Sequence, residues 1–177
     1  MRLSVAIWPP PEIVAVLGAL PRTPDVQWSA PEQWLVKVRP LGTVPERLVP
    51  DLVEALTDEL DGAPAARCRL GPKTRPLGGW LGVPVSGLDD LAAAVFDATA
   101  PIVPVTHPQP FHADVIIARG HAPASRAGQP ISGEWTADRI ALVADRSAPG
   151  RPRFEDLCEF ALVVRSTARA EIGEADF

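Results

Sequence analysis

Three histidines and one aspartate in the second half of the chain are the side chains best suited to acid–base or metal chemistry. They are His107, His112, Asp114 and His121. Because His112 and Asp114 lie two residues apart, both would point from the same face of a strand. The spacing of the four matches no standard metal site, and His107 and His121 fall in loop-like sequence. We expect no metal site and no cofactor, and we take His112 and Asp114 as candidate ligand-binding residues.

Basic candidates lie on an extended run at residues 34–41. Its alternation puts Leu35, Lys37 and Arg39 on one face and apolar residues on the other. Arginine can bind a phosphate through two parallel hydrogen bonds, and Arg119, at the end of a later strand, offers the same chemistry. Arginine is also common on protein surfaces, so a structural role for Arg39 and Arg119 is the alternative.

Hydrophobic periodicity predicts a mixed chain of helices and strands. Helices are predicted at residues 10–20, behind a capping box at 43–46 and ending at Gly62, and at 88–100, where Phe96 should face the core. Strands are predicted at residues 2–8, 26–30, 34–41, 66–70, 79–85, 111–119, 134–143 and 154–164. This order favours an α+β protein with antiparallel sheets over a doubly wound parallel sheet.

Several segments resemble the 2H phosphoesterases of the 2′-5′ RNA ligase type. Residues 31–42, PEQWLVKVRPLG, resemble the first motif of that family, P-E-x-W-H-x-T-L-x-F-L-G. Residues 110–119, PFHADVIIAR, resemble the second motif, P-F-x-P-H-x-T-L-A-R. The start of the chain and two segments near its end resemble the first and closing strands, so the likeness extends from residue 2 to about residue 163.

The resemblance implies a bilobal α+β fold, with two antiparallel sheets flanking a central cleft and helices on the outside. Residues 1–164 would form one bilobal domain, and residues 165–177 a charged C-terminal tail. In the family, each lobe presents a His-x-Thr pair to the cleft. One imidazole acts as general base and the other as general acid on a 2′,3′-cyclic phosphate or a 2′-5′ linkage, while the threonines bind phosphoryl oxygens.

The chain departs from this pattern at all four positions. Leu35 and Lys37 stand at the first His-x-Thr pair, and Asp114 and Ile116 stand at the second. Leucine and isoleucine can neither transfer a proton nor bind phosphate through their side chains. We therefore expect no catalytic residues at these positions.

The two charged replacements, Lys37 and Asp114, occupy equivalent places on the two motif strands. They could face each other across the cleft, as a salt bridge between the lobes, as two separately solvated charges, or as anchors for a ligand. Trp34 is expected in the core or at the junction of the lobes, and Trp80 is a weaker candidate to line the cleft.

The composition argues against two classes of partner. A net charge of −5 disfavours general DNA binding. No apolar run is long enough to span a membrane, and prolines interrupt the apolar start, so neither a membrane protein nor a leader peptide is expected. Cys68 and Cys158 lack C-x-x-C spacing and are expected to be reduced thiols. We expect a cytoplasmic monomer.

Three functions are consistent with these observations. The first is a 2′-5′ RNA ligase-like protein that has lost the phosphodiesterase chemistry, with a cleft that is left unused or binds a nucleotide- or phosphate-containing ligand such as an RNA terminus. Its candidate ligand-binding residues are Lys37, Arg39, His112, Asp114 and Arg119. The second is an active cyclic or 2′-5′ phosphodiesterase that uses His112, Asp114 and Lys37. The third is an interaction protein whose working surface lies outside the cleft. The missing His-x-Thr pairs favour the first, and therefore a protein that is not an enzyme.

Overall fold

The computed structural model describes residues 1–105, 111–120 and 126–165 of the chain. His107, His121 and the predicted tail from residue 166 lie outside these residues. The α-helices are α1 (Pro11–Gly18), α2 (Val49–Leu60) and α3 (Asp89–Thr99), and the short 3₁₀ helices are η1 (Pro31–Gln33) and η2 (Glu46–Leu48). The strands are β1 (Arg2–Ile7), β2 (Gln27–Trp28), β3 (Val36–Thr43), β4 (Ala66–Leu70), β5 (Arg75–Leu77), β6 (Trp80–Ser86), β7 (Ala113–Arg119), β8 (Gly133–Ala137), β9 (Arg139–Asp145) and β10 (Phe154–Ala161).

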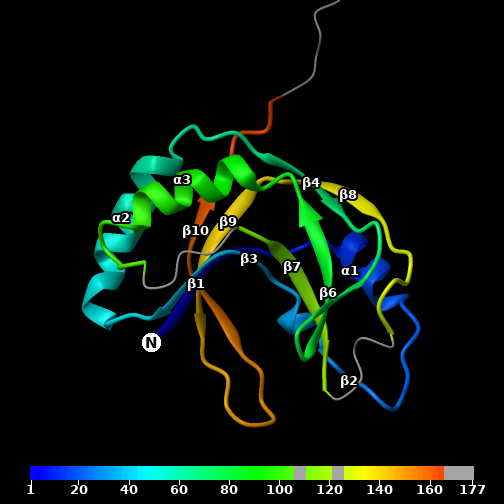
Figure 1. Ribbon diagram of the computed structural model, residues 1–177. Helices are drawn as coiled ribbons and strands as arrows, with labels where there is room; N and C mark the ends of the chain where they lie inside the picture. The colour runs from blue at the N-terminus through cyan, green and yellow to red at the C-terminus, as the bar shows by residue number, and fades with distance from the viewer. Residues whose placement is uncertain (106–110, 121–125, 166–177) are drawn as a thin grey trace, which may run out of the picture.

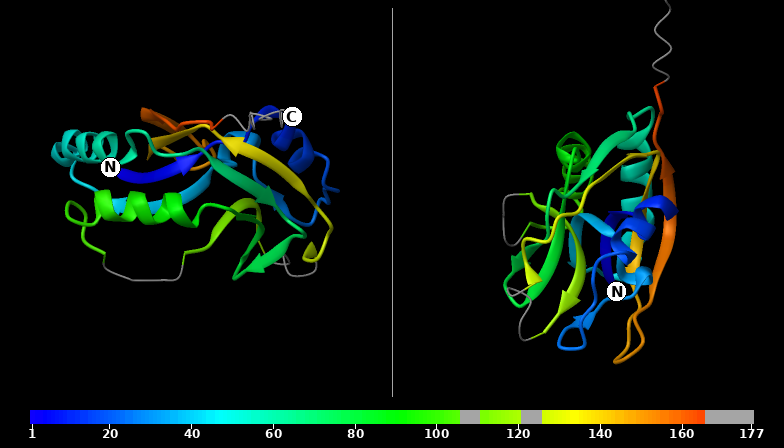
Figure 2. Two further views of the ribbon diagram at one scale, coloured as in Figure 1. Left: turned by 90° about the horizontal axis from the view of Figure 1, so that it is seen from above. Right: turned by 90° about the vertical axis from the view of Figure 1, so that its right-hand side faces the viewer.

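The strands form two antiparallel sheets, which confirms the predicted α+β class. The first sheet has the order β10-β9-β1-β3, and the second has the order β2-β7-β6-β4-β8 with β5 paired to β6. Helices α2 and α3 pack on each other at one end of the molecule, and α1 lies at the other end beside β8 (Figure 1 and Figure 2). None of the helices in the described part of the chain has the length and apolar character needed to cross a bilayer.

A core shared by both sheets and the helices holds these elements together. Leu52, Leu56 and Leu60 lie on one face of α2 at helical spacing and are almost fully buried. Each buried leucine side chain contributes roughly 2 kcal/mol of hydrophobic free energy. Strand β1 lies between two neighbours and is covered on both faces, so its residues from Leu3 to Ile7 are all buried.

The predicted strand at residues 134–143 is wrong, because two strands occupy this segment. Residues 133–137 form β8 in the second sheet, and residues 139–145 form β9 in the first. The chain passes from one sheet to the other at Asp138. Residues 140–144 are all buried, so no change in their hydrophobic alternation marks the crossing.

Two further local predictions differ from the structure. The capping box at residues 43–46 does not form, since Thr43 ends β3 and α2 begins only at Val49, after η2. The N-cap residue Leu48 makes no side-chain hydrogen bond, and a proline occupies the first turn of α2 instead. Strand β5 was not predicted, because it has only three residues and one of them is Pro76.

An ion pair ties β5 to β7 across β6. The Nε and one terminal nitrogen of Arg75 donate to the two carboxylate oxygens of Asp114, at 2.9 and 2.6 Å. Gly82 on β6 lies beneath the pair and faces Arg75 across the β5–β6 ladder. A Cβ at Gly82 would lie 3.2 Å from an Asp114 carboxylate oxygen and 2.5 Å from a methyl carbon of Leu77. Glycine therefore leaves the room in which Arg75 reaches Asp114.

Removing one member of this pair should destabilise the fold more than removing both. Asp114 is 7% exposed and Arg75 is 38% exposed, so Arg75→Met leaves a largely buried carboxylate without its partner. We expect the free energy of unfolding to fall by about 2 kcal/mol, less than for a fully buried pair because solvent reaches Arg75. The double variant Arg75→Met/Asp114→Leu should recover part of this loss. Urea denaturation of the wild type, both single variants and the double variant measures the coupling, and purely additive effects would contradict the prediction.

Cys68 on β4 is fully buried, and burial raises the pKa of its thiol from 9.0 to about 11. The neutral thiol is thus favoured more in the folded protein than in the unfolded chain. The resulting stabilisation is complete below pH 9, because the thiol is then protonated in both states. It is lost as the pH rises from 9 through 11.

A comparison with Cys68→Val isolates this effect. Relative to the variant, the free energy of unfolding of the wild type should fall by about 2–3 kcal/mol from below pH 9 to above pH 11, as expected for a shift of about two pKa units. Denaturant titrations at several pH values measure it. The partly exposed Cys158 is present in both proteins, so its own titration cancels. A stability difference that stays constant across this pH range would show that the Cys68 thiol is not the titrating group.

Candidate ligand-binding site

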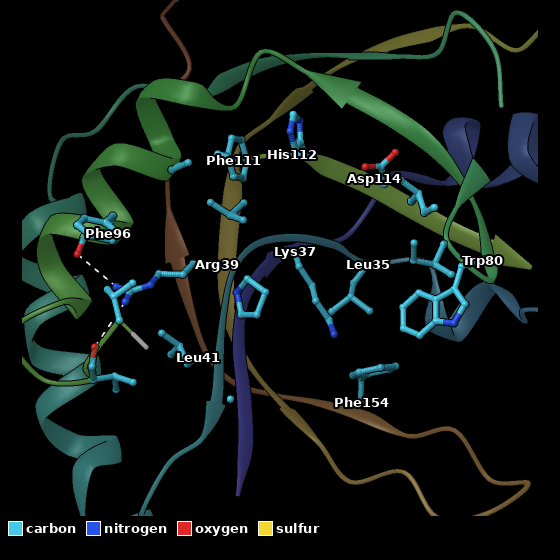
Figure 3. Close-up of a pocket in the computed structure, with 18 of the residues that line it drawn as sticks. Leu35, Lys37, Arg39, Leu41, Trp80, Phe96, Phe111, His112, Asp114 and Phe154 are labelled. Atoms are coloured by element: carbon cyan, nitrogen blue, oxygen red, sulfur yellow. Dashed lines mark hydrogen bonds between the residues drawn. The ribbon is translucent and has the colours of Figure 1, made fainter. Parts of the chain in front are cut away.

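A cleft of about 950 Å³ lies between the two sheets (Figure 3). Its walls include β3 from the first sheet, β6 and β7 from the second, and α3. The cleft is lined by all four residues at the His-x-Thr positions, namely Leu35, Lys37, Asp114 and Ile116. The two motif strands therefore face one shared cavity, as the sequence predicts.

Strand β3 separates a core face from a cleft face. It is an edge strand of the first sheet. Val36 and Val38 are buried in the main core, whereas Lys37 and Arg39 point from the opposite face into the cleft. The predicted alternation is thus confirmed for residues 35–39, whereas Pro40 and Leu41, beyond an irregularity in the pairing of β3 with β1, both line the cleft.

Strand β7 is divided in the same way. Val115 and Ile117 are buried in the core. Asp114 and Ile116 line the cleft from the opposite face, with the carboxylate of Asp114 largely covered and Ile116 partly exposed. The contrast between the faces fixes the register of both motif strands, because a shift of one residue would exchange core and cleft side chains.

The floor of the cleft on the first sheet is apolar. Leu35, at the first His position, is 5% exposed. It packs in a small cluster with Ala6, Ala141 and Val143, against which Trp8 and Phe154 lie. The rings of Trp8 and Phe154 meet edge to face, with centroids 6.3 Å apart. An apolar surface therefore stands where the related family presents a proton-transferring imidazole.

Lys37 rises from this floor. Its side chain is exposed to the solvent in the cleft, yet the surrounding protein is close enough that burial lowers the pKa of its amine. The charge of Asp145 opposes this effect, while Arg2 and Arg119 add to it. Within the described ranges, no carboxylate lies at ion-pair distance from Lys37.

The salt bridge considered between Lys37 and Asp114 does not form. Both carboxylate oxygens of Asp114 accept hydrogen bonds from Arg75. Asp114 is therefore held within its own sheet and does not tie the two lobes together.

Arg39 is held by the C-terminal end of α3. It donates to the carbonyl oxygens of Phe96 and Val103, at 3.3 and 3.5 Å, and to the hydroxyl of Thr99. Its guanidinium also lies 4.7 Å from the centroid of the Phe96 ring. Cations are favourable at this end of a helix, where carbonyl groups lack partners. These contacts give Arg39 a structural role at one end of the cleft.

Phe96 does not face the core, contrary to the prediction from helical spacing. It is 45% exposed and lines the cleft beside Arg39 (Figure 3). The neighbouring Val95 takes the core position on α3 and is fully buried. Val95 lies near the middle of the buried stripe of α3, and Phe96, rotated from it by about 100°, falls at the edge of that stripe.

Arg119 on β7 and Trp80 on β6 contact each other in the wall of the cleft that the second sheet forms. They are paired across β6 and β7, and the Arg119 guanidinium lies 4.6 Å from the centroid of the Trp80 ring. Such a contact contributes roughly 0.5–1 kcal/mol at an exposed site. Trp80 lines the cleft and Trp34 is buried in the core, so both tryptophans lie where the sequence predicts.

His112 lies just before β7 and also lines the cleft, on the side of Phe111 and Asp114 (Figure 3). Among the described residues no hydrogen bond joins His112 to Asp114, so this carboxylate does not orient the imidazole. Metal-type clusters of three His, Cys, Asp or Glu side chains are likewise absent from the described part of the chain. In the described part of the chain, His112 thus has no hydrogen-bonded side chain that could act as its acid–base partner.

Sequence reasoning missed two residues that shape the site, Arg75 and Phe154. Arg75 neutralises Asp114 from β5, and Phe154 contributes an aromatic surface from β10. Neither belongs to a motif. The sequence did offer one indication of a partner for Asp114. A carboxylate within a strand that is otherwise largely buried requires a cationic or hydrogen-bonding partner.

Comparison with protein-family models gives no match, and comparison with curated proteins gives none either. Solved structures do match over nearly the full chain. TT0787 of Thermus thermophilus has a TM-score of 0.80 at 23% identity, covering 92% of this chain and 98% of its own. Escherichia coli LigT in complex with 3′-AMP has a TM-score of 0.76 at 22% identity, covering 91% and 97%. A protein described as a phosphoesterase has a TM-score of 0.70 at 25% identity, covering 91% and 98%.

The matches extend over more than nine tenths of this chain and of each matched chain, with TM-scores of 0.70–0.80. The identities are low, so the likeness concerns the fold. The chain therefore has the fold of the 2H phosphoesterases, of the LigT type.

Proposed function

We propose that this protein is a 2H-fold protein without phosphodiesterase activity, whose cleft binds a small nucleotide- or phosphate-containing ligand. One observation carries the proposal. The four positions of the two His-x-Thr pairs line one cleft but hold Leu35, Lys37, Asp114 and Ile116. The chain thus has the cleft, but it lacks the two histidines that would act as general acid and general base there.

The chemistry of in-line phosphoryl transfer explains why this matters. A general base must activate the attacking group while a general acid protonates the leaving oxygen. Leu35 and Ile116 supply neither, and both oxygens of Asp114 are occupied by Arg75. His112 could fill one of the two roles. The alternative of an active phosphodiesterase that uses His112, Asp114 and Lys37 therefore has less support.

The ligand class is inferred from the cleft and from the structural neighbours. Escherichia coli LigT has been solved with 3′-AMP, NADP⁺, ATP and phosphate. In the present chain, Lys37 and Arg119 bring positive charge to the cleft, and Trp80 and Phe154 bring aromatic surface. A nucleotide combines an anionic group with a planar base, so it can use both kinds of contact.

A hydrolysis assay tests the absence of catalysis. Wild-type protein should not hydrolyse a 2′,3′-cyclic nucleotide, whereas Leu35→His/Lys37→Thr/Asp114→His/Ile116→Thr restores both motif pairs and should gain activity. In that variant Arg75 loses its carboxylate and lies beside an introduced imidazole, where its charge opposes protonation. Adding Arg75→Gln should therefore raise the activity further. Turnover by the wild type that disappears in His112→Ala would overturn the proposal.

Thermal stabilisation tests ligand binding. At about 100-fold excess over Kd, 3′-AMP, ATP or NADP⁺ should stabilise the wild type by about 2.7 kcal/mol, or a rise of roughly 5–10 °C in Tm. Ile116→Trp places a large ring in the cleft and should abolish this rise. Val164→Trp is the matched control, because Val164 is 58% exposed and does not line the cleft. If none of the three nucleotides changes Tm, an interaction protein with its working surface outside the cleft becomes the better hypothesis.

A further inference from the structure

Lys37 and Arg119 differ from the other cations that line the cleft. Arg39 is engaged by the end of α3, and Arg75, just behind the wall, is engaged by Asp114. For Lys37 and Arg119, in contrast, the described residues offer no carboxylate at ion-pair distance. Two cations that line one cavity without an ion-pair partner among the described residues favour an anion between them, against the negative charge that Asp89 in the cleft lining and Asp145 near Lys37 contribute.

The two charges are close enough to influence each other. Burial has the largest effect on the pKa of Lys37 and lowers it, while the charge of Asp145 raises it. The charges of Arg2 and Arg119 lower this pKa further. Asp145 accepts a hydrogen bond from the backbone N–H of Ser147 and so is partly engaged. An anion bound between Lys37 and Arg119 would relieve their mutual repulsion.

Arg119 is already held in place for such a contact. Its guanidinium carbon lies 4.6 Å from the centroid of the Trp80 ring, and this contact restricts the side chain. The N–H groups of a guanidinium can donate to an oxyanion. Less side-chain entropy is then lost when a ligand binds.

The surroundings of these cations are apolar, unlike the polar pairs of the related enzymes. The Lys37 side chain extends toward the part of the cleft that holds Leu35, Trp80 and Phe154 (Figure 3). Ile116 and Leu77 add aliphatic surface from the second sheet. Apart from the indole N–H of Trp80, these side chains offer no hydrogen bonds to a phosphoryl group, and they favour contact with a ring or an aliphatic chain.

We propose that Lys37 and Arg119 form an anion-binding subsite, and that the cleft takes an amphipathic organic anion. The acidic group of the ligand lies between the two cations, and its apolar or aromatic body covers Leu35, Ile116 and Phe154. The proposal rests on the binding function proposed above and names the chemistry of its ligand. A nucleotide would place its phosphate at Lys37 and Arg119 and its base on the apolar surface.

Two fluorescent probes separate the charge from the apolar body. The probe 8-anilinonaphthalene-1-sulfonate carries one sulfonate, and N-phenyl-1-naphthylamine has the same ring system without it. The sulfonate should bind the wild type and lose about 10-fold or more in affinity in Lys37→Met and in Arg119→Gln, as expected for a lost charged hydrogen bond. The neutral probe should keep its affinity within about 3-fold, because the apolar surface remains. Lys73→Met is the matched control, since Lys73 is an exposed lysine that does not line the cleft.

The outcomes distinguish this subsite from the proposed function. Equal sulfonate affinity in the wild type, Lys37→Met and Arg119→Gln would overturn the subsite, as would equal losses for both probes. If 3′-AMP raises the Tm of the wild type and of Lys37→Met/Arg119→Gln alike, the subsite is wrong while nucleotide binding stands. If sulfonate binding requires both cations but 3′-AMP, ATP and NADP⁺ do not displace it, the subsite stands and the ligand is an anion other than a nucleotide. Circular dichroism of each variant confirms that it is folded.

Discussion

The site depends on the alternation of side chains along β3 and β7. Each strand lies with one face against the shared core and the other against the cleft. Since successive residues point to opposite faces, the buried valines of β3 and the buried Val115 and Ile117 of β7 determine which residues enter the cleft. The core therefore fixes the cleft positions, whatever residue types occupy them. The fold can persist while the chemistry of those four positions changes.

The replacements have also been integrated into the structure. Leu35 has become part of an apolar floor with Ala6, Ala141 and Val143. Asp114 would repel an anionic ligand if it stood alone, but Arg75 neutralises it from β5, and Gly82 leaves the space for that contact. A carboxylate at this place thus needs two further residues to be tolerated. This dependence is in keeping with the proposal of a cleft that binds a ligand without phosphodiesterase chemistry.

The sequence was sufficient for the features that depend on local patterns. Strand alternation correctly assigned Leu35, Lys37 and Arg39 to one face of β3, and Asp114 and Ile116 to one face of β7. The two antiparallel sheets also followed from the order of elements and the resemblance. Strand alternation repeats every two residues, and the order of elements is read directly along the chain. Both can therefore be predicted from short segments without knowing their distant contacts.

Features that depend on distant partners were not predictable. Arg75 lies 39 residues from Asp114, and no local signal links them. The role of Arg39 depends on its hydrogen bonds to residues at and beyond the end of α3, which lie 57 to 64 residues later in the sequence. The crossing between sheets at Asp138 is hidden because the residues after it are buried on both faces. Phe96 was misplaced because it lies at the edge of the apolar stripe of α3, next to the buried Val95, and only the packing of the whole fold shows that this edge faces the cleft.

The most direct test of a cleft that binds without catalysis is equilibrium binding of 2′,3′-cyclic AMP, followed by mass spectrometry of the recovered nucleotide. The proposed function predicts saturable binding, with the cyclic phosphate recovered intact after prolonged incubation. Recovery of ring-opened 2′- or 3′-AMP, in proportion to protein concentration and time, would contradict it.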